Sequence, residues 1–315
     1  MNAAVYQILI GTLFVVVFCI GYPMQGETKE PTLRVMSYNI HRGGVVMRKQ
    51  PLSQTAKAIR LAKADIVGIQ ETRSPRGDKL EELATLLGWN HDMGKGSQIL
   101  TRYEIVDSLY RGVKVKLDSG SHAYVFNVHL ASHPYQPYQL LEIRPRWHKH
   151  TNDLTFINTE AEAIEWANKA RGAEIAKVLR QIKSLPDKKA PVFVVGDFNE
   201  PSHLDWTEAA AKAGRHPIKV EYPNSLAMKK AGFSDAYRTL YPDEMKYPGY
   251  TWSSFYKFDD PTTHHDRIDF VYFKGSGLTV KDIRIVGENK KDADIVISPY
   301  PSDHRAVVAT LELSK

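Results

Sequence analysis

The stretch VFVVGDFN, residues 192–199, decides the fold class of this chain. Its first half, VFVV, is a short β-branched and aromatic run, which is typical of a buried strand. Side chains two apart on a strand share a face, so Asp197 and Asn199 converge on one site if the chain stays extended between them. Because a carboxylate is rarely buried without a metal ion, an ion pair or several hydrogen bonds, the stretch indicates a phosphate or metal site. Gly-Asp and Asn are also ordinary turn residues, so a simple turn is the alternative.

Around this stretch, the composition predicts one large folded domain behind an apolar N-terminal segment. The chain has 315 residues, 43% of them hydrophobic, and no Gly/Ser linker, charge block or internal repeat divides it. Residues 1–26 carry no charged side chain, and residues 3–20 are almost all apolar, which suits a secretory signal or a membrane anchor. We therefore predict a signal peptide or N-terminal membrane anchor at 1–26 and a domain at 27–315. This arrangement predicts a periplasmic, extracellular or membrane-anchored protein outside the cytoplasm.

Charge and cysteine content narrow the possible functions of the domain. The single cysteine, Cys19, lies in the N-terminal segment, so residues 27–315 contain neither a disulfide nor a thiol nucleophile. Disulfide-stapled scaffolds and cysteine-dependent enzymes are thereby excluded. The formal net charge of +6 belongs entirely to the domain, because residues 1–26 are uncharged. This excess favours anionic partners such as nucleic acid, phospholipid surfaces or phosphate esters, and it also suits plain solubility.

Strand and helix patterns predict an α+β protein, an α/β sandwich with two sheets inside and helices outside. Thr159 with Glu162 forms a capping-box signature, and apolar residues follow at helical spacing, which predicts a long helix before the strand at 192. Residues 131–158 show no clear periodicity, and we interpret them as a substrate-facing insertion. The other predicted strands lie near 33–40, 65–71, 97–101, 104–117, 122–130, 267–273 and 306–313, with helices near 52–63 and 79–87.

Acidic, amide and histidine residues stand at the ends of at least five predicted strands. Each has an ordinary explanation alone, such as a turn, a helix cap, an ion pair with a neighbouring Lys or Arg, or a structural histidine. Their ordered recurrence instead indicates one shared functional site. These residues are Asn39, Glu71, His129, Asp197 with Asn199, Asp269, and Asp303 with His304.

These motifs together resemble the endonuclease/exonuclease/phosphatase superfamily, which shares the fold of pancreatic deoxyribonuclease. The resemblance implies two mainly antiparallel sheets packed face to face with helices outside, and a divalent-metal-dependent hydrolase of phosphoesters, in the first place a phosphodiesterase. The motifs appear in the family's order, from residue 33 to the C-terminus. They are Ser37-Tyr38-Asn39, Gln70-Glu71, Val128-His129-Leu130, Gly196-Asp197-Phe198-Asn199, Arg267-Ile268-Asp269-Phe270 and Ser302-Asp303-His304.

The same resemblance implies a metal site and a group that activates water. Asn39, Glu71 and Asp303 would hold Mg²⁺, with Mn²⁺ as a substitute, because hard divalent cations prefer oxygen ligands. Asp197 would orient and deprotonate the attacking water. Asn199 would donate its amide hydrogens to a nonbridging phosphoryl oxygen, where charge develops in the transition state.

Two histidines complete the implied catalytic set. His129 and His304 would bind the phosphate and assist proton transfer, because imidazole titrates near neutral pH. Asp269 would hydrogen-bond to His304 and hold its orientation, and Asp266 is the competing candidate for that role. We prefer Asp269, since strand alternation turns it away from the apolar face that Ile268 and Phe270 define.

Basic and aromatic residues supply candidates for substrate binding. Arg144, Arg146 and Trp147 lie in the 131–158 insertion, and Trp252 lies in a loop before Asp266. Such mixtures suit a nucleic-acid backbone with stacked bases, and equally a phospholipid headgroup at an interface. The substrate therefore stays open between nucleic acid and phospholipid. Short motifs such as that at 38–41 look more like exported bacterial members of the superfamily than like base-excision endonucleases.

Two further alternatives bear on function. A binding module with the same fold but no catalysis is possible in principle, although the complete set of acidic, amide and histidine residues argues against it. His264 and His265 alone do not predict a zinc site, because no third ligand stands at a fixed spacing. No protein partner is predicted.

Overall fold

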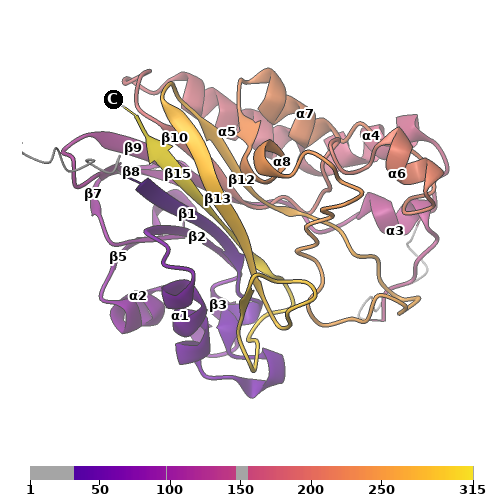
Figure 1. Cartoon of the computed structure of the whole chain (residues 1–315), viewed down its shortest axis with the longest axis horizontal. Coiled ribbons are helices and arrows are strands. Elements are labelled where there is room, and N and C mark those ends of the chain that lie inside the picture. Colours follow the sequence, from indigo (N-terminus) through magenta and orange to yellow (C-terminus); the bar gives the residue numbers. More distant parts are fainter. Residues whose placement is uncertain (1–31, 97, 147–154, 315) are drawn as a thin grey trace, which may run out of the picture. The chain divides into compact units, whose positions relative to one another are not determined.

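Two β-sheets packed face to face form the centre of the computed structural model, which describes residues 32–96, 98–146 and 155–314 (Figure 1). Within these ranges the first sheet has seven strands, in the order β14 (Ile295–Val296), β13 (Leu278–Gly287), β15 (Ala306–Leu313), β1 (Thr32–Asn39), β2 (Ile66–Gln70), β6 (Ile99–Thr101) and β5 (Asn90–Asp92). The second has six, in the order β11 (Ser234–Asp235), β12 (Asp269–Lys274), β10 (Val192–Asp197), β9 (His122–His129), β8 (Gly112–Lys116) and β7 (Glu104–Leu109).

Most neighbouring strands in both sheets run antiparallel, which confirms the predicted α/β sandwich. The parallel pairs are β1 with β2, β10 with β9, and β13 with β14. The described residues between 32 and 314 cluster as one compact unit. A separate two-stranded ribbon pairs β3 (Arg73–Ser74) with β4 (Gly77–Asp78).

Alternation of side chains along the central strands builds the layers of the core. On β1, Leu33 and Val35 face the second sheet, whereas Met36 and Tyr38 face outward. On β10, Phe193 and Val195 join the core between the sheets, and Val192 and Val194 lie on the outer face. Each central strand is therefore buried on both faces, which explains the continuous apolar run that the sequence shows at 192–195.

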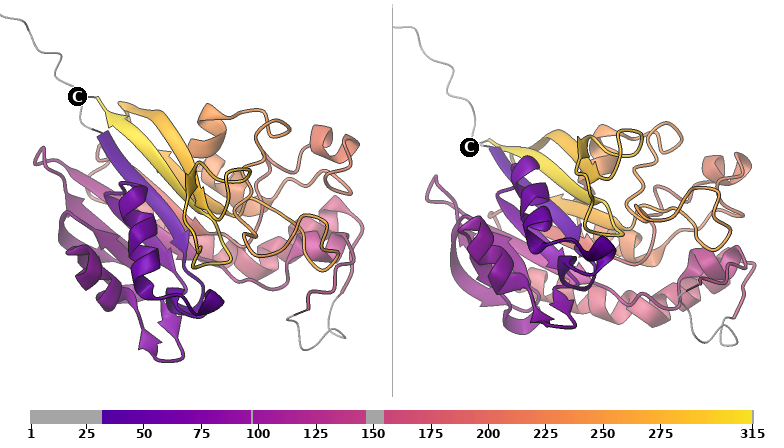
Figure 2. Two further views of the ribbon diagram at one scale, coloured as in Figure 1. Left: turned by 60° about the horizontal axis from the view of Figure 1, so that its bottom comes forward. Right: turned by 90° about the horizontal axis from the view of Figure 1, so that it is seen from below.

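Helices cover the outer face of each sheet, as the two further views in Figure 2 show. α1 (Leu52–Leu61) and α2 (Leu80–Leu87) pack on the first sheet through residues such as Ile59 and Leu83. α5 (Ala173–Lys183) and α7 (Pro223–Lys230) pack on the second through Val178 and Met228. The other α-helices of the described residues are α3 (Gln136–Leu140), α4 (Glu160–Ala167), α6 (Glu208–Lys212) and α8 (Ala236–Leu240).

The helix predicted before β10 is present, with one interruption. Thr159 caps α4, and its side chain accepts from the backbone N–H of Glu162 while the Glu162 carboxylate accepts from the backbone N–H of Thr159. The capping box predicted from the sequence is thus confirmed. A single π-helical turn, Asn168–Gly172, separates α4 from α5, and it carries the buried Arg171.

Several segments differ from the sequence-based prediction. The single strand predicted at 104–117 is a hairpin, β7 and β8, because the chain turns at Tyr110 and Arg111. The insertion contains the short helix α3, and the long strand β13 was not predicted. The apolar segment at 1–26 lies outside the described residues, and within the described part no helix combines the length and apolarity that crossing a bilayer requires.

Candidate active site

The alternation that builds the core also places the predicted site residues at one end of it. Asp197 continues the inward face of Phe193 and Val195 on β10. It lies opposite His129 on β9 and opposite Asp269 on β12. Residues directly opposite each other on neighbouring strands point to the same face. Three predicted catalytic side chains therefore enter the space between the sheets at one level.

Close backbone packing requires the glycine of the GDFN motif. Gly196 has φ of +146°, and a Cβ atom there would lie 2.0 Å from the carbonyl oxygen of Val128. Asn199 has φ of +47°, so the chain turns after Asp197 instead of staying extended. The predicted turn is therefore present, and it is this turn, rather than extended chain, that brings Asn199 onto Asp197.

Asp197 is the centre of the hydrogen-bond network and is only 1% exposed. Its Oδ2 accepts from Nδ2 of Asn39 at 3.0 Å and from Nδ2 of Asn199 at 3.2 Å. Nε2 of His129 and Nε2 of His304 each lie 3.7 Å from the same oxygen. Its Oδ1 accepts from the backbone N–H of Asn199 at 2.8 Å. Two amides and two imidazoles thus surround one buried carboxylate.

His304 and Asp269 form a buried pair beside Asp197. Nδ1 of His304 lies 2.9 Å from Oδ2 of Asp269. The backbone N–H of Asp269 donates to Oγ1 of Thr251, and that of His304 donates to Oγ of Ser302. Burial lowers the pKa of His304, but the charges of Asp269 and Asp197 outweigh it and raise that pKa well above its usual value. The pair therefore holds the imidazole with Nε2 directed at Asp197.

The alternative partner, Asp266, does not contact His304. Its carboxylate accepts from the hydroxyl of Tyr135 at 2.6 Å and from Nε1 of Trp206 at 2.9 Å. Asp266 and Asp269 are three residues apart in extended chain, so their side chains leave on opposite faces. Asp269 is not the ion-pair partner of Arg267 either, because the Arg267 guanidinium forms ion pairs with Asp205 and Asp235.

The predicted metal ligands Glu71 and Asp303 present carboxylates that fit a hard divalent cation. Oδ1 of Asp303 is buried and has no hydrogen-bond partner among the described residues. A buried acceptor without a partner is costly, and a cation would satisfy it. Glu71 has φ of +58° and is held by the amide of Asn39 and the backbone N–H of Arg42. This backbone strain at a polar site is typical of functional residues.

Two amides lie differently from the roles that the family resemblance implies. Asn39 turns Nδ2 toward Glu71 and Asp197, and its Oδ1 accepts from the backbone N–H of His41. It therefore bridges two carboxylates here, where an oxygen ligand was expected. Asn199 donates from Nδ2 to the carbonyl of Leu130 and to Asp197, which uses both amide hydrogens expected for a phosphoryl oxygen.

His41 is a site residue that was not predicted, although it directly follows the Ser-Tyr-Asn-Ile motif. Its Nδ1 lies 3.0 Å from Oδ2 of Asp303 and 3.9 Å from Oε2 of Glu71. Burial lowers the pKa of His41, but the hydrogen bond and charge of Asp303 outweigh this effect and raise it. An imidazole thus lies between the two carboxylates expected to hold the metal.

A cavity of about 400 Å³ opens above these groups. Four histidines line it, and no Lys or Arg is among the described residues that do so. Aromatic side chains of the insertion and of the 252–256 loop form the walls. The lining residues are His41, Met47, Glu71, His129, Ser132, His133, Tyr135, Tyr138, Asp197, Asn199, Trp252, Phe255, Tyr256, Ile268, Asp303 and His304.

Of the predicted substrate-binding residues, Trp252 lines this cavity, and its ring centroid lies 4.8 Å from that of His304. Arg144 instead lies over the ring of Phe156. Arg146 is 68% exposed and lies 3.6 Å from Asp260. Neither arginine lines the cavity, and Trp147 falls outside the described residues. The cavity wall thus comes from aromatic side chains rather than from the predicted arginines.

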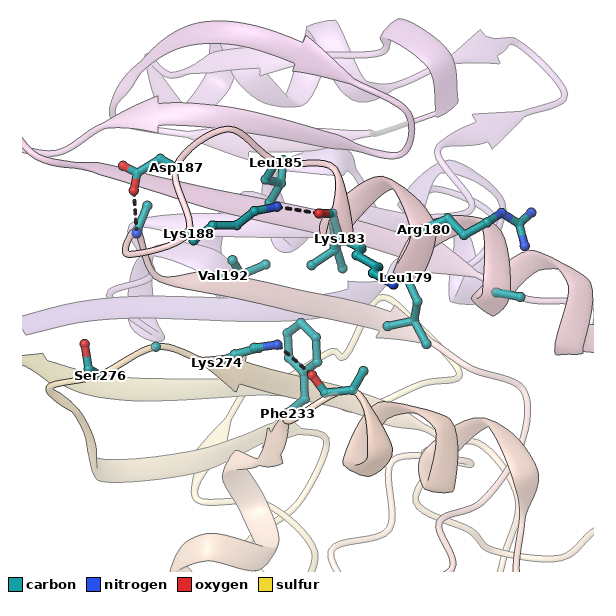
Figure 3. A pocket seen from close by; sticks show the side chains of 15 residues that line it. Leu179, Arg180, Lys183, Leu185, Asp187, Lys188, Val192, Phe233, Lys274 and Ser276 are labelled. Carbon is teal, nitrogen blue, oxygen red and sulfur yellow. Dashed lines mark hydrogen bonds between the residues drawn. The ribbon is translucent and has the colours of Figure 1, made fainter.

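A larger cavity of about 1110 Å³ lies elsewhere, along α5 and the ends of β10 and β12 (Figure 3). Apolar residues such as Leu179, Leu185 and Phe233 line it, together with lysines at its edge. Lys274, for example, donates to the carbonyl of Ala231. None of the predicted site residues reaches this cavity. The smaller cavity is therefore the candidate active site.

Arg171 holds the insertion against the site and provides a test of that arrangement. It is 1% exposed and donates to the carbonyls of Ala131 and Pro134 and to Oε1 of Gln136, at 2.7 to 2.8 Å. It also lies 3.9 Å from Glu200, a carboxyl whose pKa burial raises to about 7 even though the charge of Arg171 lowers it. Removing Arg171 would leave this buried carboxylate unpaired.

We expect Arg171→Met to lower the free energy of unfolding by about 3–5 kcal/mol, as for other broken buried ion pairs. Without Arg171, the folded-state pKa of Glu200 rises further above its unfolded value. The loss should therefore be larger above pH 7 than below it. Urea unfolding at both pH values measures this, with the exposed Arg180→Met on α5 as the matched control. Equal stability of the two variants would contradict the role of Arg171.

Comparison with known proteins agrees with this geometry. The family model described as Endonuclease/Exonuclease/phosphatase family matches residues 36–304. The uncharacterised protein F14F9.5 of Caenorhabditis elegans is 29% identical over 301 residues, which cover 88% of this chain and 90% of that protein.

Two solved structures share the fold. The endonuclease/exonuclease/phosphatase of Beutenbergia cavernae is 17% identical with a TM-score of 0.53, over 90% of this chain and 72% of that one. D. rerio TDP2, complexed with single strand DNA product, is 17% identical with a TM-score of 0.50, over 90% and 99%. With the family match spanning the site from β1 to His304, the chain belongs to the Endonuclease/Exonuclease/phosphatase family, and this membership supports phosphoester hydrolysis as its chemistry.

Proposed function

We propose that this protein is a divalent-metal-dependent phosphodiesterase that uses Asp197 to activate water. The observation that carries the proposal is the convergence of His129, His304 and two amides on Oδ2 of Asp197 beside a cavity of about 400 Å³. A buried carboxylate fixed by neutral amides keeps its lone pairs directed. Such an arrangement suits a general base, which must be held within hydrogen-bond reach of the water it deprotonates.

Each residue of the site has a role that follows from its contacts. Asn39 and Asn199 fix the rotamer of Asp197 by donating to it. Asp269 holds Nδ1 of His304, so Nε2 of that ring faces the cavity, where it can bind a phosphoryl oxygen or move a proton. His129 lies at the same level on β9 and can do the same from the other side. Mg²⁺ held by Glu71 and Asp303 would polarise the phosphoryl oxygen and offset charge on the leaving oxygen.

The walls of the cavity favour a nucleic-acid end or single strand as substrate. Trp252, Tyr135 and Tyr138 offer aromatic faces, and Phe255 is exposed at the lining. Aromatic faces stack bases with little dependence on sequence. A volume of about 400 Å³ is that of a small-molecule site, which suits one nucleotide better than a duplex. The presence of single strand DNA product in D. rerio TDP2 supports the same choice.

Side-by-side assays on single-stranded DNA, plasmid DNA, RNA, sphingomyelin and inositol phosphates test this proposal. Metal-dependent cleavage of single-stranded nucleic acid with little lipid turnover is the expected result. Preferential turnover of sphingomyelin would replace the nucleic-acid assignment with a lipid one. Binding of single-stranded DNA with no hydrolysis of any phosphoester would instead favour a binding module with this fold.

The metal site makes a separate prediction. Glu71→Gln keeps the size of the side chain but removes its charge and replaces one accepting oxygen by an amide nitrogen, so the Mg²⁺ concentration for half-maximal activity should rise at least about 10-fold. Calorimetric titration of Mg²⁺ into the protein measures the same change without activity. Glu104→Gln, at an exposed position on β7, is the matched control. An unchanged Mg²⁺ affinity in Glu71→Gln would remove Glu71 from the metal site.

We further propose export of the protein through the apolar segment at 3–20, either as a cleaved signal or as a retained anchor. The support is the uncharged stretch of residues 1–26. Fractionation of cells that express the full chain, with N-terminal sequencing of the product, tests this. Recovery of the intact chain in the cytosol would contradict it.

A further inference from the structure

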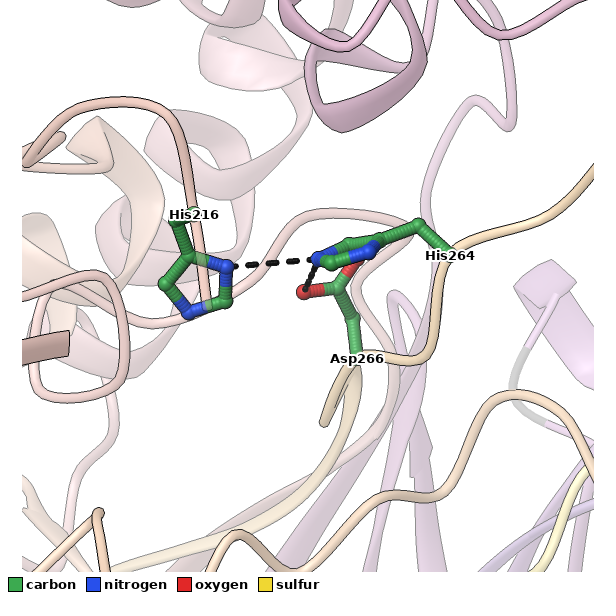
Figure 4. A group of neighbouring side chains, drawn as sticks. All are labelled: His216, His264 and Asp266. Atoms are coloured by element: carbon green, nitrogen blue, oxygen red, sulfur yellow. Dashed lines mark hydrogen bonds and ion pairs between the residues drawn. The ribbon is translucent and has the colours of Figure 1, made fainter. Parts of the chain in front are cut away.

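Three side chains that could bind a metal meet behind the wall of the cavity, outside the site described above (Figure 4). His216 precedes His264 by 48 residues, and Asp266 follows two residues later. Nδ1 of His216 lies 3.2 Å from Nε2 of His264, which in turn lies 3.7 Å from Oδ1 of Asp266. The fold thus gives His264 two partners, His216 and Asp266, whereas its neighbour His265 is not part of the cluster.

The spacing of these three atoms matches tetrahedral zinc coordination. Ligand bonds of about 2.0–2.1 Å at tetrahedral angles place neighbouring ligand atoms about 3.3 Å apart. The separations of 3.2 and 3.7 Å bracket that value, and all three residues offer ligand atoms within 4.8 Å of one another. These distances suit a cation shared by the three side chains.

The charge of Asp266 gives an independent reason to expect a cation. The residue is 2% exposed, and among the described residues no Lys or Arg forms an ion pair with it. The adjacent Arg267 is turned to Asp205 and Asp235. Buried carboxylates are usually paired with a positive charge or coordinate a metal. Tyr135 and Trp206 donate to this carboxylate as neutral groups, and Nε2 of His264 lies 3.7 Å away, so a cation shared with that imidazole would compensate its charge.

The surrounding residues hold the three side chains in ligand geometry. Trp206 stacks on the ring of His216 with centroids 4.1 Å apart and planes 10° apart, and its Nε1 also donates to Asp266. Hydrogen bonds to a ligating carboxylate are the usual support of a metal site.

We propose that His216, His264 and Asp266 bind a zinc ion that stabilises the wall of the candidate active site. Asp266 exchanges backbone hydrogen bonds with Trp252 and accepts from Tyr135, and both of these aromatic residues line the cavity. The ion would tie the loop after α6, the 249–266 loop and the insertion together. The site is separate from the Glu71 and Asp303 carboxylates and does not depend on the proposed reaction.

Titration of Co²⁺ and Zn²⁺ into the metal-stripped full chain tests the proposal. Excess Mg²⁺ is present throughout, so that it occupies the oxygen ligands of the catalytic site. One equivalent of Co²⁺ should bind with the visible absorption of tetrahedral coordination and be displaced by Zn²⁺. His216→Ala and His264→Gln should each weaken binding at least about 10-fold, and Tyr135→Phe, which keeps all three ligands, by about 10- to 100-fold.

His203→Gln is the matched control, because this histidine hydrogen-bonds to Ser225 away from the cluster and should leave the affinity unchanged. Circular dichroism checks that each variant is folded. If a ligand variant is unfolded, the Co²⁺ spectrum of the wild type and the metal affinity of Tyr135→Phe decide whether the proposal stands. Absence of a tetrahedral Co²⁺ spectrum, or equal affinity in wild type and all folded variants, would overturn the proposal.

Discussion

The variant Asp197→Ala is expected to lower kcat for phosphodiester hydrolysis by about 100- to 10,000-fold, the contribution typical of a positioned general base. Asp197 is the carboxylate on which His129, His304 and the two site amides converge. No other carboxylate described here lies between both histidines in this way. Because the cavity opens beside the substitution, water can enter and satisfy the amides that lose their acceptor.

Steady-state kinetics on bis(4-nitrophenyl) phosphate measures this loss, and urea unfolding checks that the variant is folded. Asp107→Ala, at an exposed position on β7, is the matched control and should retain full activity. A folded Asp197→Ala variant with turnover within about 10-fold of the wild type would exclude Asp197 as the base, because that loss is below the range for this role.

The pair of His304 and Asp269 should behave as one unit. His304→Gln and Asp269→Asn are each expected to lower kcat by about 100- to 10,000-fold, because Asp269 acts only by holding the ring that it contacts at 2.9 Å. Once His304 is gone, the loss of Asp269 removes nothing more from the reaction. The double variant should therefore be about as slow as the slower single variant.

A double-mutant cycle on kcat measures the coupling between these two residues. Tyr250→Phe tests general sensitivity of the neighbouring loop, because Tyr250 lies before Asp266 and is not among the residues lining the cavity. Losses in His304→Gln and Asp269→Asn that multiply in the double variant would show that the two residues act independently. That outcome would mean that a group other than Asp269 positions His304.

Strand alternation made much of the site predictable from the sequence. The alternation of side chains along β10 that buries Val195 also directs Asp197 between the sheets. The same alternation directs Asp269 and His129, which lie opposite Asp197 on the neighbouring strands, to that face. Order along the chain then sufficed to expect one shared site. The capping box at Thr159 was also predictable from the sequence, because its two residues are only three positions apart.

Features that depend on backbone turns or distant contacts could not be predicted in this way. His41 and Asn199 have positive φ, a conformation that is uncommon even for His and Asn, although both types are enriched in it, and this backbone conformation affects where their side chains point. The start of the insertion is held by Arg171, which lies 35 to 40 residues further along the chain than the acceptors it bonds, at Ala131, Pro134 and Gln136, so no local periodicity could reveal this arrangement. His216 reaches His264 only through the tertiary fold, so no sequence spacing revealed that cluster.

The central claim is that the cavity above Asp197 hydrolyses phosphodiesters with the help of a divalent metal. Its most direct test is the initial rate of bis(4-nitrophenyl) phosphate hydrolysis by the metal-stripped wild type before and after addition of Mg²⁺ or Mn²⁺. We predict little activity without metal, full recovery on addition, and no recovery in Asp197→Ala under the same conditions. Equal rates with and without metal, or equal recovery in Asp197→Ala, would contradict the account.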